Sequence, residues 1–290
     1  LIKNDSPNSY LKKIYSSLLN TRPTVVNLKW ALDKTINNIQ KNSIKNKKER
    51  AYEIARSIRD NDIINCQKIA TNGYKIIEEY YKKKKKTVNI LTHCNAGWLA
   101  TVDWGTAISP IFLAHRNGIP IHVWVDETRP RNQGALLTAW ELKNEQVPYT
   151  MVADNSGGHL MQENKVDLCI VGSDRVVANG DVCNKIGTYL KALSAFENNI
   201  PFFVALPTST IDLNLKHGKN VPIEIRNEKE LSTIKIRKNS KIIEGSIYFD
   251  KAKVYNPAFD VTPYRYITKL ITEKGIINCN KDSIKNLMKL

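Results

Sequence analysis

The sequence predicts an α/β protein in which a helical N-terminal domain precedes a Rossmann-like domain with a doubly wound parallel sheet. Residues 1–81 place apolar side chains at helical spacing and show no strand pattern. From Thr87 onward, short runs rich in Val and Ile alternate with helical patterns of about ten residues, which is typical of parallel strands joined by crossover helices. The expected domains are residues 1–86, ending in a basic linker, and residues 87–290.

Helical patterns account for the first part of the chain. Val26 and Trp30 share one helical face after an Arg-Pro turn. A second apolar pattern begins near Ala51 and continues to Tyr80. The lysines at positions 82–86 are then expected to form an exposed helix end or a linker.

The second part is expected to contain five strands with helices between them. The strands are predicted at residues 88–91, 121–125, 148–154, 166–171 and 202–206. Helices are predicted at residues 107–117, 135–145, 158–163 and 185–198, with a closing helix between Pro263 and Gly275. Residues 222–253 are more polar and are expected to be irregular.

Composition indicates an ordinary globular protein rather than a membrane or secreted one. The chain has 290 residues, of which 42% are hydrophobic and 25% charged. No apolar stretch approaches the roughly 20 residues of a membrane span, and no secretory signal opens the chain. The five cysteines are scattered without metal-binding spacing, so we expect reduced thiols, a cytoplasmic location and no metal site.

The net charge of +16 does not by itself predict a nucleic-acid binder. Lysines are spread along the chain, and no RNP, KH or helix-turn-helix motif accompanies them, so binding to nucleic acid is disfavoured. The G-x-G-x-x-G and P-loop motifs are also absent from the sequence. We therefore expect no dinucleotide or nucleoside triphosphate cofactor.

Polar tips follow three of the apolar runs. They are residues 92–97 (THCNAG), 126–134 (DETRPRNQG) and 172–185 (GSDRVVANGDVCNK). In an open parallel sheet the carboxyl ends of the strands face one crevice, where ligands bind. A thiol, carboxylates, arginines, an amide and a lysine should therefore meet there, as in an active site.

Two residues in these tips are candidate catalytic groups. Cys94 follows the first strand, where backbone N–H groups and a helix N-terminus are expected to stabilise a thiolate; the alternative is an inert buried cysteine. Asp174 directly follows the fourth strand, and partial burial beside other ionisable groups would suit it to general acid or base catalysis. The alternative for Asp174 is a salt bridge to Arg175 or a turn cap.

Four further residues are candidate ligands of the substrate. Asn184 and Lys185 are expected at a helix N-terminus, where N–H groups and a cation suit a phosphate. Arg22 and Gln133 supply additional partners for anionic and hydroxyl groups. Together with a thiol and a carboxylate, these groups suit proton or hydride transfer on a sugar phosphate. The spacing of these residues in the sequence does not identify the reaction further.

The same motifs resemble the methylthioribose-1-phosphate isomerase family. The resemblance extends over about residues 21–277 and is carried by residues 21–28 (TRPTVVNL), 92–97, 125–130 (VDETRP), 171–189, 209–212 (STID) and 256–263 (NPAFDVTP). This family shares its fold with the alpha, beta and delta subunits of the exchange factor for eukaryotic translation initiation factor 2.

The resemblance implies an aldose–ketose isomerase, an intramolecular oxidoreductase of methionine salvage. It would convert 5-methylthio-D-ribose 1-phosphate into 5-methylthio-D-ribulose 1-phosphate without a cofactor, as a cytoplasmic homodimer. Asp174 would act as the acid at the ring oxygen, and Cys94 would help to move hydrogen between C2 and C1. The substrate and phosphate contacts implied by the resemblance are Arg22, Gln133, Asn184 and Lys185.

Two alternatives remain open at this point. One is an isomerase of a related sugar phosphate, such as 5-deoxyribose 1-phosphate or ribose 1,5-bisphosphate. The other is a non-catalytic binding protein of the translation-factor type. The chain departs from the family pattern where Leu136 replaces a usual arginine and Ile225 a usual glutamate. It also lacks the family's opening strand-rich segment with its Arg-Gly-Ala-Pro-Ala-Ile-Gly stretch, so the start of the protein is expected to be missing.

Overall fold

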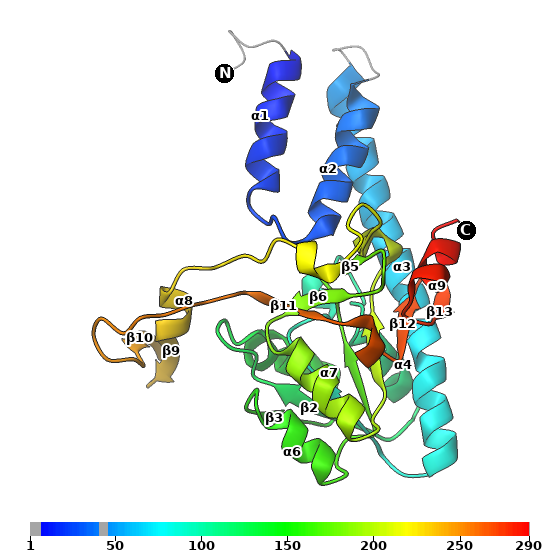
Figure 1. Ribbon diagram of the computed structural model, residues 1–290, viewed down its shortest axis with the longest axis vertical. Helices are drawn as coiled ribbons and strands as arrows, with labels where there is room; N and C mark the ends of the chain where they lie inside the picture. Colours follow the sequence, from blue (N-terminus) through cyan, green and yellow to red (C-terminus); the bar gives the residue numbers. More distant parts are fainter. Residues whose placement is uncertain (1–6, 41–45, 290) are drawn as a thin grey trace.

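The computed structural model describes residues 7–40 and 46–289, so the helical prediction for residues 1–6 and 41–45 lies outside the described part. Three helices, α1 (Pro7–Leu19), α2 (Val26–Ile39) and α3 (Lys47–Lys84), come first in the chain. Figure 1 shows α1, α2 and the beginning of α3 projecting from a body that contains the sheets. No helix among the described residues is both long and apolar enough to cross a membrane.

The long helix α3 joins the projecting helices to the core of the body. Its first half lies beside α2, whereas Ile69 and Ile77 of its second half are fully buried in the core cluster of the sheet. The helix ends with three lysines in its last turn, and Lys85 caps it in a left-handed conformation. The lysine run is therefore the end of a helix, as one of the two predictions for it stated.

The main sheet confirms the predicted α/β architecture. Within the described residues its strands have the order β13-β12-β7-β4-β1-β2-β3, and every neighbouring pair except β12–β13 is parallel. The strands are β1 (Val88–Thr92), β2 (Ile121–Asp126), β3 (Tyr149–Val152), β4 (Leu168–Val171), β7 (Phe202–Ala205), β12 (Lys269–Thr272) and β13 (Gly275–Ile277). From the centre of the sheet, the chain first adds parallel strands in one direction, from β1 to β3, and then in the other direction, from β4 to β12. This is the arrangement of a Rossmann-type sheet, and the direction of winding reverses between β1 and β4.

Helices cover both faces of this sheet, as predicted. Neighbouring residues of β1 point to opposite faces: Ile90 joins the core cluster of α3 and α4 (Ser109–Arg116), and Leu91 joins the cluster of α6 (Gly157–Gln162) and α7 (Thr188–Glu197). A π-helical turn, η3 (Gly134–Thr138), continues into α5 (Ala139–Asn144) between β2 and β3. Burial on both faces explains why these strands have almost uninterrupted apolar sequences.

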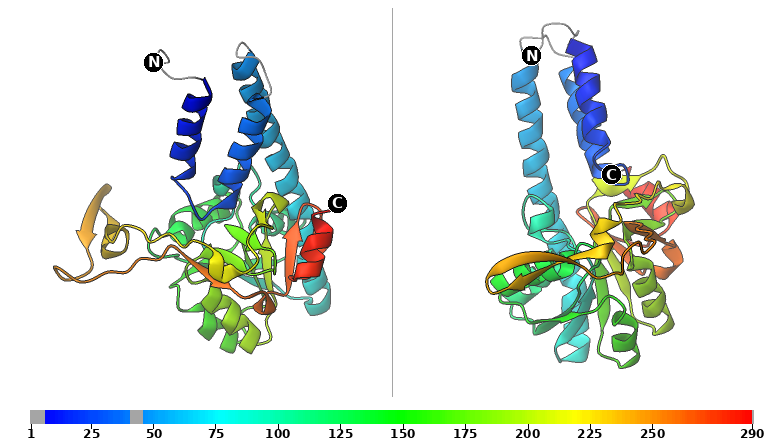
Figure 2. Two further views of the ribbon diagram at one scale, coloured as in Figure 1. Left: turned by 45° about the horizontal axis from the view of Figure 1, so that its top comes forward. Right: turned by 90° about the vertical axis from the view of Figure 1, so that its left-hand side faces the viewer.

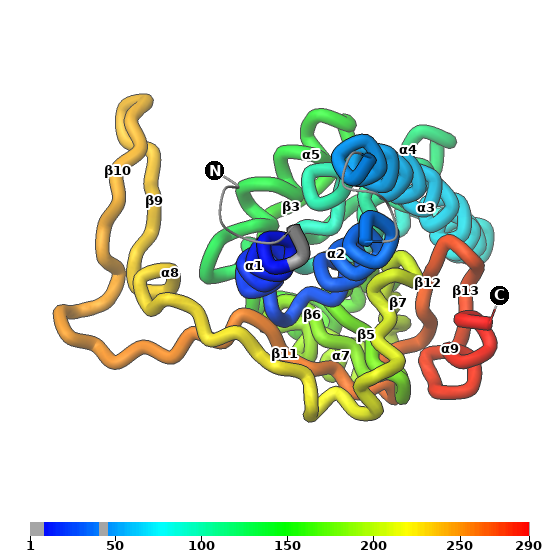
Figure 3. The backbone as a smooth tube through the Cα atoms, turned by 90° about the horizontal axis from the view of Figure 1, so that it is seen from above, coloured from blue at the N-terminus to red at the C-terminus, as the bar shows by residue number. Residues whose placement is uncertain are grey.

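A smaller sheet and a hairpin complete the fold. The smaller sheet has the order β11-β6-β5-β8 and consists of β5 (Arg175–Val177), β6 (Val182–Lys185), β8 (Ile211–Asp212) and β11 (Phe259–Thr262). The predicted irregular segment instead contains α8 (Lys229–Ser232) and the hairpin of β9 (Thr233–Lys238) and β10 (Lys241–Ser246). Figures 2 and 3 show this hairpin extending well away from the body. The remaining short elements are η2 (Trp98–Ala100), η4 (Thr208–Thr210), η5 (Gly218–Asn220), η6 (Tyr264–Tyr266) and α9 (Lys281–Leu287).

Two further predictions about the second half of the chain are wrong. The segment between Pro263 and Gly275 is not a closing helix but a short turn followed by β12, because Leu270 and Ile271 find a parallel partner along the free edge of β7. The helix predicted to start at Lys185 begins at Thr188. Residue Lys185 instead pairs with Phe259 in the smaller sheet, and Gly187, with φ at +100°, turns the chain into α7.

Candidate functional site

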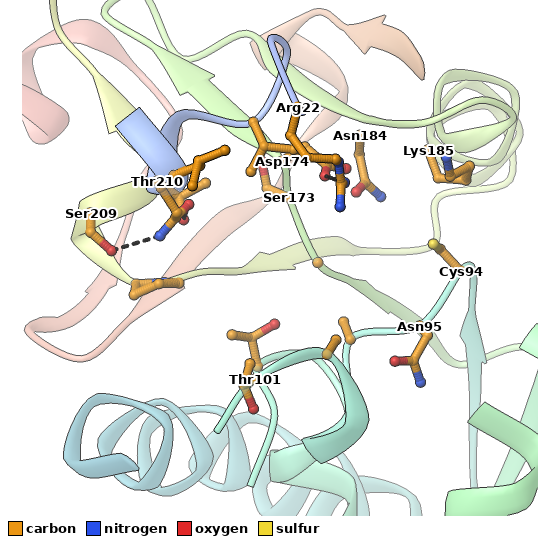
Figure 4. A pocket seen from close by; sticks show the side chains of 18 of the residues that line it. Arg22, Cys94, Asn95, Thr101, Ser173, Asp174, Asn184, Lys185, Ser209 and Thr210 are labelled. Carbon is orange, nitrogen blue, oxygen red and sulfur yellow. Dashed lines mark hydrogen bonds and ion pairs between the residues drawn. The ribbon is translucent and has the colours of Figure 1, made fainter. Parts of the chain in front are cut away.

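A pocket of about 740 Å³ opens where the carboxyl ends of β1 and β4 meet the smaller sheet. This position is the point at which the winding of the sheet reverses, the usual place for a ligand in this architecture. All six residues proposed from the sequence line the pocket: Arg22, Cys94, Gln133, Asp174, Asn184 and Lys185. Figure 4 shows Arg22, Asp174, Asn184, Lys185 and Cys94 arranged around it.

Cys94 is the second residue after β1 and is held by the neighbouring tip. Its backbone adopts a left-handed conformation with φ at 69°. Its N–H donates to Thr128 Oγ1 at 2.9 Å, and its carbonyl oxygen accepts from Thr138 Oγ1 at 2.7 Å. The position of the thiol is thus fixed by contacts from the chain that follows β2.

The expectation that the Cys94 thiolate is stabilised is wrong. Burial raises the pKa of the thiol to about 11, and the charge of Asp174 acts in the same direction. The cations Lys185 and Arg226 and the Asn95 N–H oppose this change without cancelling it. The oriented N–H group is present, but the loss of hydration outweighs it, so the thiol is neutral near pH 7.

Asp174 follows β4 and faces the same pocket. Burial raises the pKa of its carboxyl group, while Lys185, Arg22 and Arg226 act to lower it. The alternative prediction, a salt bridge to Arg175, is wrong: Arg175 pairs with Asp212 at 3.1 Å. Asp174 is left with Arg22, whose Nη2 lies 3.8 Å from Asp174 Oδ1.

Asn184 and Lys185 enter the pocket from a strand rather than from the predicted helix N-terminus, because they belong to β6. The Asn184 amide donates to Thr188 Oγ1 at 3.0 Å, and Lys185 Nζ donates to the Ala258 carbonyl oxygen at 3.0 Å. The same Nζ lies 4.4 Å from the centre of the Phe259 ring. Burial lowers the pKa of Lys185, so its ammonium is a poorly hydrated cation well suited to an anionic partner.

The other two proposed ligands lie at different depths. The Arg22 side chain is about half exposed at the pocket mouth. Gln133 lies where the β2 tip meets η3, and its Oε1 is buried without a hydrogen-bond partner among the described residues. A hydroxyl group or other donor entering the pocket would satisfy this oxygen.

Sequence reasoning missed Arg226 as a pocket residue. Its guanidinium lies 5.3 Å from the centre of the Phe259 ring and pairs with Glu224 at 3.0 Å. The side chain is only 10% exposed, and its charge acts on Cys94, Asp174 and Lys185. A signal was present, because Arg226 directly follows Ile225 in a stretch that resembles the family pattern, but this stretch lies in a segment predicted to be irregular.

One group of the described residues has the spacing of metal ligands: His93, Asp126 and Asp154. Lys191 enters this group from α7, and its Nζ lies 3.0 Å from Asp126 Oδ2. An ammonium therefore already occupies the cationic position beside the Asp126 carboxylate, which disfavours a metal ion there.

Comparison with known proteins agrees with the sequence motifs. Residues 4–279 match the model of the Initiation factor 2 subunit family. Methylthioribose-1-phosphate isomerase of Escherichia coli O45:K1 is 51% identical over 289 residues, covering 99% of this chain and 78% of the relative. The protein of the same name from Methylorubrum extorquens is 49% identical over 288 residues, covering 99% of this chain and 79% of the relative.

Solved structures show the same relationship. The crystal structure of 5-methylthioribose 1-phosphate isomerase from Pyrococcus horikoshii OT3 superposes with a TM-score of 0.81 at 39% identity, covering 99% of this chain and 78% of that one. The delta subunit of translation initiation factor eIF-2B from A. fulgidus gives 0.76 at 38% identity, covering 97% of this chain and 78% of that one. With a family model that matches nearly its whole length and relatives that share about half of its residues, the chain belongs to the Initiation factor 2 subunit family.

Proposed function

We propose that this chain is a methylthioribose-1-phosphate isomerase, which converts 5-methylthio-D-ribose 1-phosphate into 5-methylthio-D-ribulose 1-phosphate in methionine salvage. The observation that carries the proposal is the meeting of Cys94 and Asp174 in one pocket lined by cations, at the two strands that flank the reversal of the sheet. Relatives of that name that share about half of the sequence support it.

The first chemical step is opening of the sugar ring. The phosphate on C1 blocks spontaneous opening, so an acid must protonate the ring oxygen while the bond between C1 and that oxygen breaks. The raised pKa of Asp174 keeps a larger fraction of this carboxyl group protonated, which suits the role. Lys185 and Arg226 then face the negative charge of the phosphate.

The second step moves hydrogen from C2 to C1, while the hydroxyl on C2 becomes the ketone and gives its proton to the Asp174 carboxylate left by the first step. A thiolate at Cys94 would be needed to abstract a proton from C2. Because burial keeps this thiol neutral near pH 7, we favour a direct hydride shift from C2 to C1 beside the Cys94 side chain. When the substrate fills the pocket, the apolar residues of the lining would displace water and so strengthen the interactions that hold the open-chain cation.

The pocket also favours an apolar substituent on C5. Part of its wall is apolar and comprises Trp30, Ile58, Leu99, Val102 and Leu137. Asp62 lies on the same lining, and its charge would repel a second phosphate. The methylthio substrate, or its 5-deoxy analogue, therefore suits this pocket better than ribose 1,5-bisphosphate does.

The direct test is incubation of the purified chain with 5-methylthioribose 1-phosphate, followed by phosphorus NMR of the anomeric phosphate. We expect a ketose 1-phosphate signal and slower conversion of ribose 1,5-bisphosphate at equal concentration. Tight binding of the methylthio sugar with no conversion would instead favour the non-catalytic alternative.

A homodimer in the cytoplasm is part of the proposal. The hairpin exposes Ile236, Ile243 and Ile242, and Phe249 beyond it is 82% exposed. Ile236 and Ile243 are paired across the two strands and so share one apolar face of the hairpin, which supports a second copy as its partner. Light scattering after size exclusion is expected to give twice the 33.0 kDa of one chain. A shift to the monomer mass in Ile243→Lys would support the hairpin as the contact.

A further inference from the structure

Behind Cys94 lies a buried ionic cluster that the proposed mechanism does not use. It consists of His93 after β1, Asp126 at the end of β2, Asp154 after β3, Lys191 of α7 and Asp260 of β11. The side chains of His93 and Asp126 are completely buried, and that of Lys191 is 4% exposed. Burying so many charges is costly, so a cluster of this kind needs an explanation.

Both ring nitrogens of His93 face oxygen acceptors. Nδ1 lies 2.9 Å from Asp126 Oδ2, and Nε2 lies 2.8 Å from the carbonyl oxygen of Ile186. A carbonyl oxygen can only accept, and Asp126 Oδ2 also faces the ammonium of Lys191. The ring therefore connects the end of β2 to the segment between β6 and α7.

Charged groups from several elements surround the ring. Asp126, Asp154 and Asp260 bring three carboxyl groups to the cluster, and Lys191 brings one ammonium. Asp260 accepts from the Gly187 N–H at 2.6 Å, and although burial raises its pKa to about 6, the charges of His93 and Lys191 oppose that change. The thiol of Cys169 faces the cluster from β4 and is neutral.

The ring also joins the two sides of the pocket. Cys94 is the next residue in the chain, and Asn184 and Lys185 directly precede Ile186. Gly187 allows this approach, because a Cβ atom there would lie 3.2 Å from the ring. The contacts of His93 thus determine how far the thiol lies from the groups expected to bind phosphate.

We propose that His93 is a positioning residue whose two ring contacts fix Cys94 relative to Asn184 and Lys185. The catalytic consequence rests on the proposed isomerase, whereas the ring contacts do not. Misplacing a reacting group by about 1 Å can cost on the order of 100-fold in rate. We therefore expect His93→Leu to lower kcat by about 100-fold with a much smaller change in KM.

Matched variants separate the two contacts of the ring. His93→Asn keeps a donor near Nδ1 for Asp126, and His93→Gln keeps one near Nε2 for Ile186. Each is expected to recover part of the kcat lost in His93→Leu. The control is His122→Leu, since the His122 ring lies on β2 against Thr150 Oγ1 and Trp124, and His122 is not among the described residues that line the pocket. Wild-type kcat in a folded His93→Leu would overturn the positioning role.

Nitrogen NMR of the histidine ring provides a readout that does not depend on turnover. In the wild-type chain we expect a His93 ring signal that shows a contact to Ile186, assigned by its loss in His93→Gln. Absence of this contact would overturn the positioning role. If the wild-type chain converts no sugar phosphate, the proposed function fails while this measurement still decides whether the His93 ring bridges the two segments. If the variants do not fold, the wild-type spectrum decides it alone.

Discussion

Arg22 and Asp174 lie side by side in the lining of the pocket, with Arg22 Nη2 3.8 Å from Asp174 Oδ1. The first residue lies between two helices of the projecting part, and the second follows a strand of the main sheet. Arg175 holds the segment that contains Arg22 beside the strand end, because its guanidinium donates to the carbonyl oxygens of Pro23 and Thr24. The helical part of the chain therefore contributes a charge directly to the proposed catalytic acid.

Arg22→Met is expected to move the basic limb of the pH–rate profile to higher pH. Asp174 acts while protonated, so the rate falls as pH rises through its pKa. Arg22 lowers that pKa, and its removal should raise it further. Arg22→Lys, which keeps the charge, serves as the control in steady-state assays across pH. An unchanged limb in Arg22→Met would contradict the pairing.

Asp174→Asn is expected to lower kcat by about 10²- to 10⁴-fold, the usual contribution of a general acid. An amide has the shape of the carboxyl group but cannot give a proton to the ring oxygen. Circular dichroism should show an unchanged fold. Turnover close to that of wild type, measured by phosphorus NMR, would remove Asp174 from the mechanism.

The alkylation rate of Cys94 by iodoacetamide is expected to rise with pH until about pH 11. The thiolate is the reactive form, and burial raises the pKa of this thiol from 9.0 to about 11, so little thiolate exists near neutral pH. Lys185→Met should slow the reaction further, because Lys185 lowers this pKa. Peptide mass spectrometry at each pH gives the rate. Fast labelling of native protein at pH 7 would argue for a stabilised thiolate.

Substrate deuterated at C2 should give a product that keeps the deuterium at C1. A direct hydride shift transfers the hydrogen without exchange, whereas an enediolate formed by a thiolate base can lose it to water. The neutral Cys94 thiol is the reason for expecting retention. Proton NMR of the product in ordinary water measures the label, and washout faster than turnover would favour the enediolate.

Gly134→Ala is expected to lower the free energy of unfolding by about 1–3 kcal/mol, the usual cost of overpacking. A Cβ atom at Gly134 would lie 1.7 Å from the carbonyl oxygen of Asp126, so the strand end would have to move. Gly245→Ala is the control, because a Cβ atom added there, on the hairpin, would meet no other atom within 4 Å. Urea denaturation compares the two variants, and equal stability would contradict the close approach.

The sequence by itself determined strands β1, β2, β3, β4 and β7 of the main sheet and the location of the pocket. Strands buried on both faces require nearly continuous apolar runs, so their positions were visible without coordinates. Polar residues that follow parallel strands must lie at the same edge of the sheet. The sequence therefore already predicted that Cys94 and Asp174 lie close together.

Only the tertiary structure decided the partners and environments of these residues. Lys185 lies on a strand because β11 returns from far along the chain to pair with it, and no local pattern encodes that meeting. Likewise, Leu270 forms a strand because β7 offers a free edge. The neutral Cys94 thiol and the ionic cluster around His93 depend on burial and on groups from several elements, and these exist only once the chain has folded.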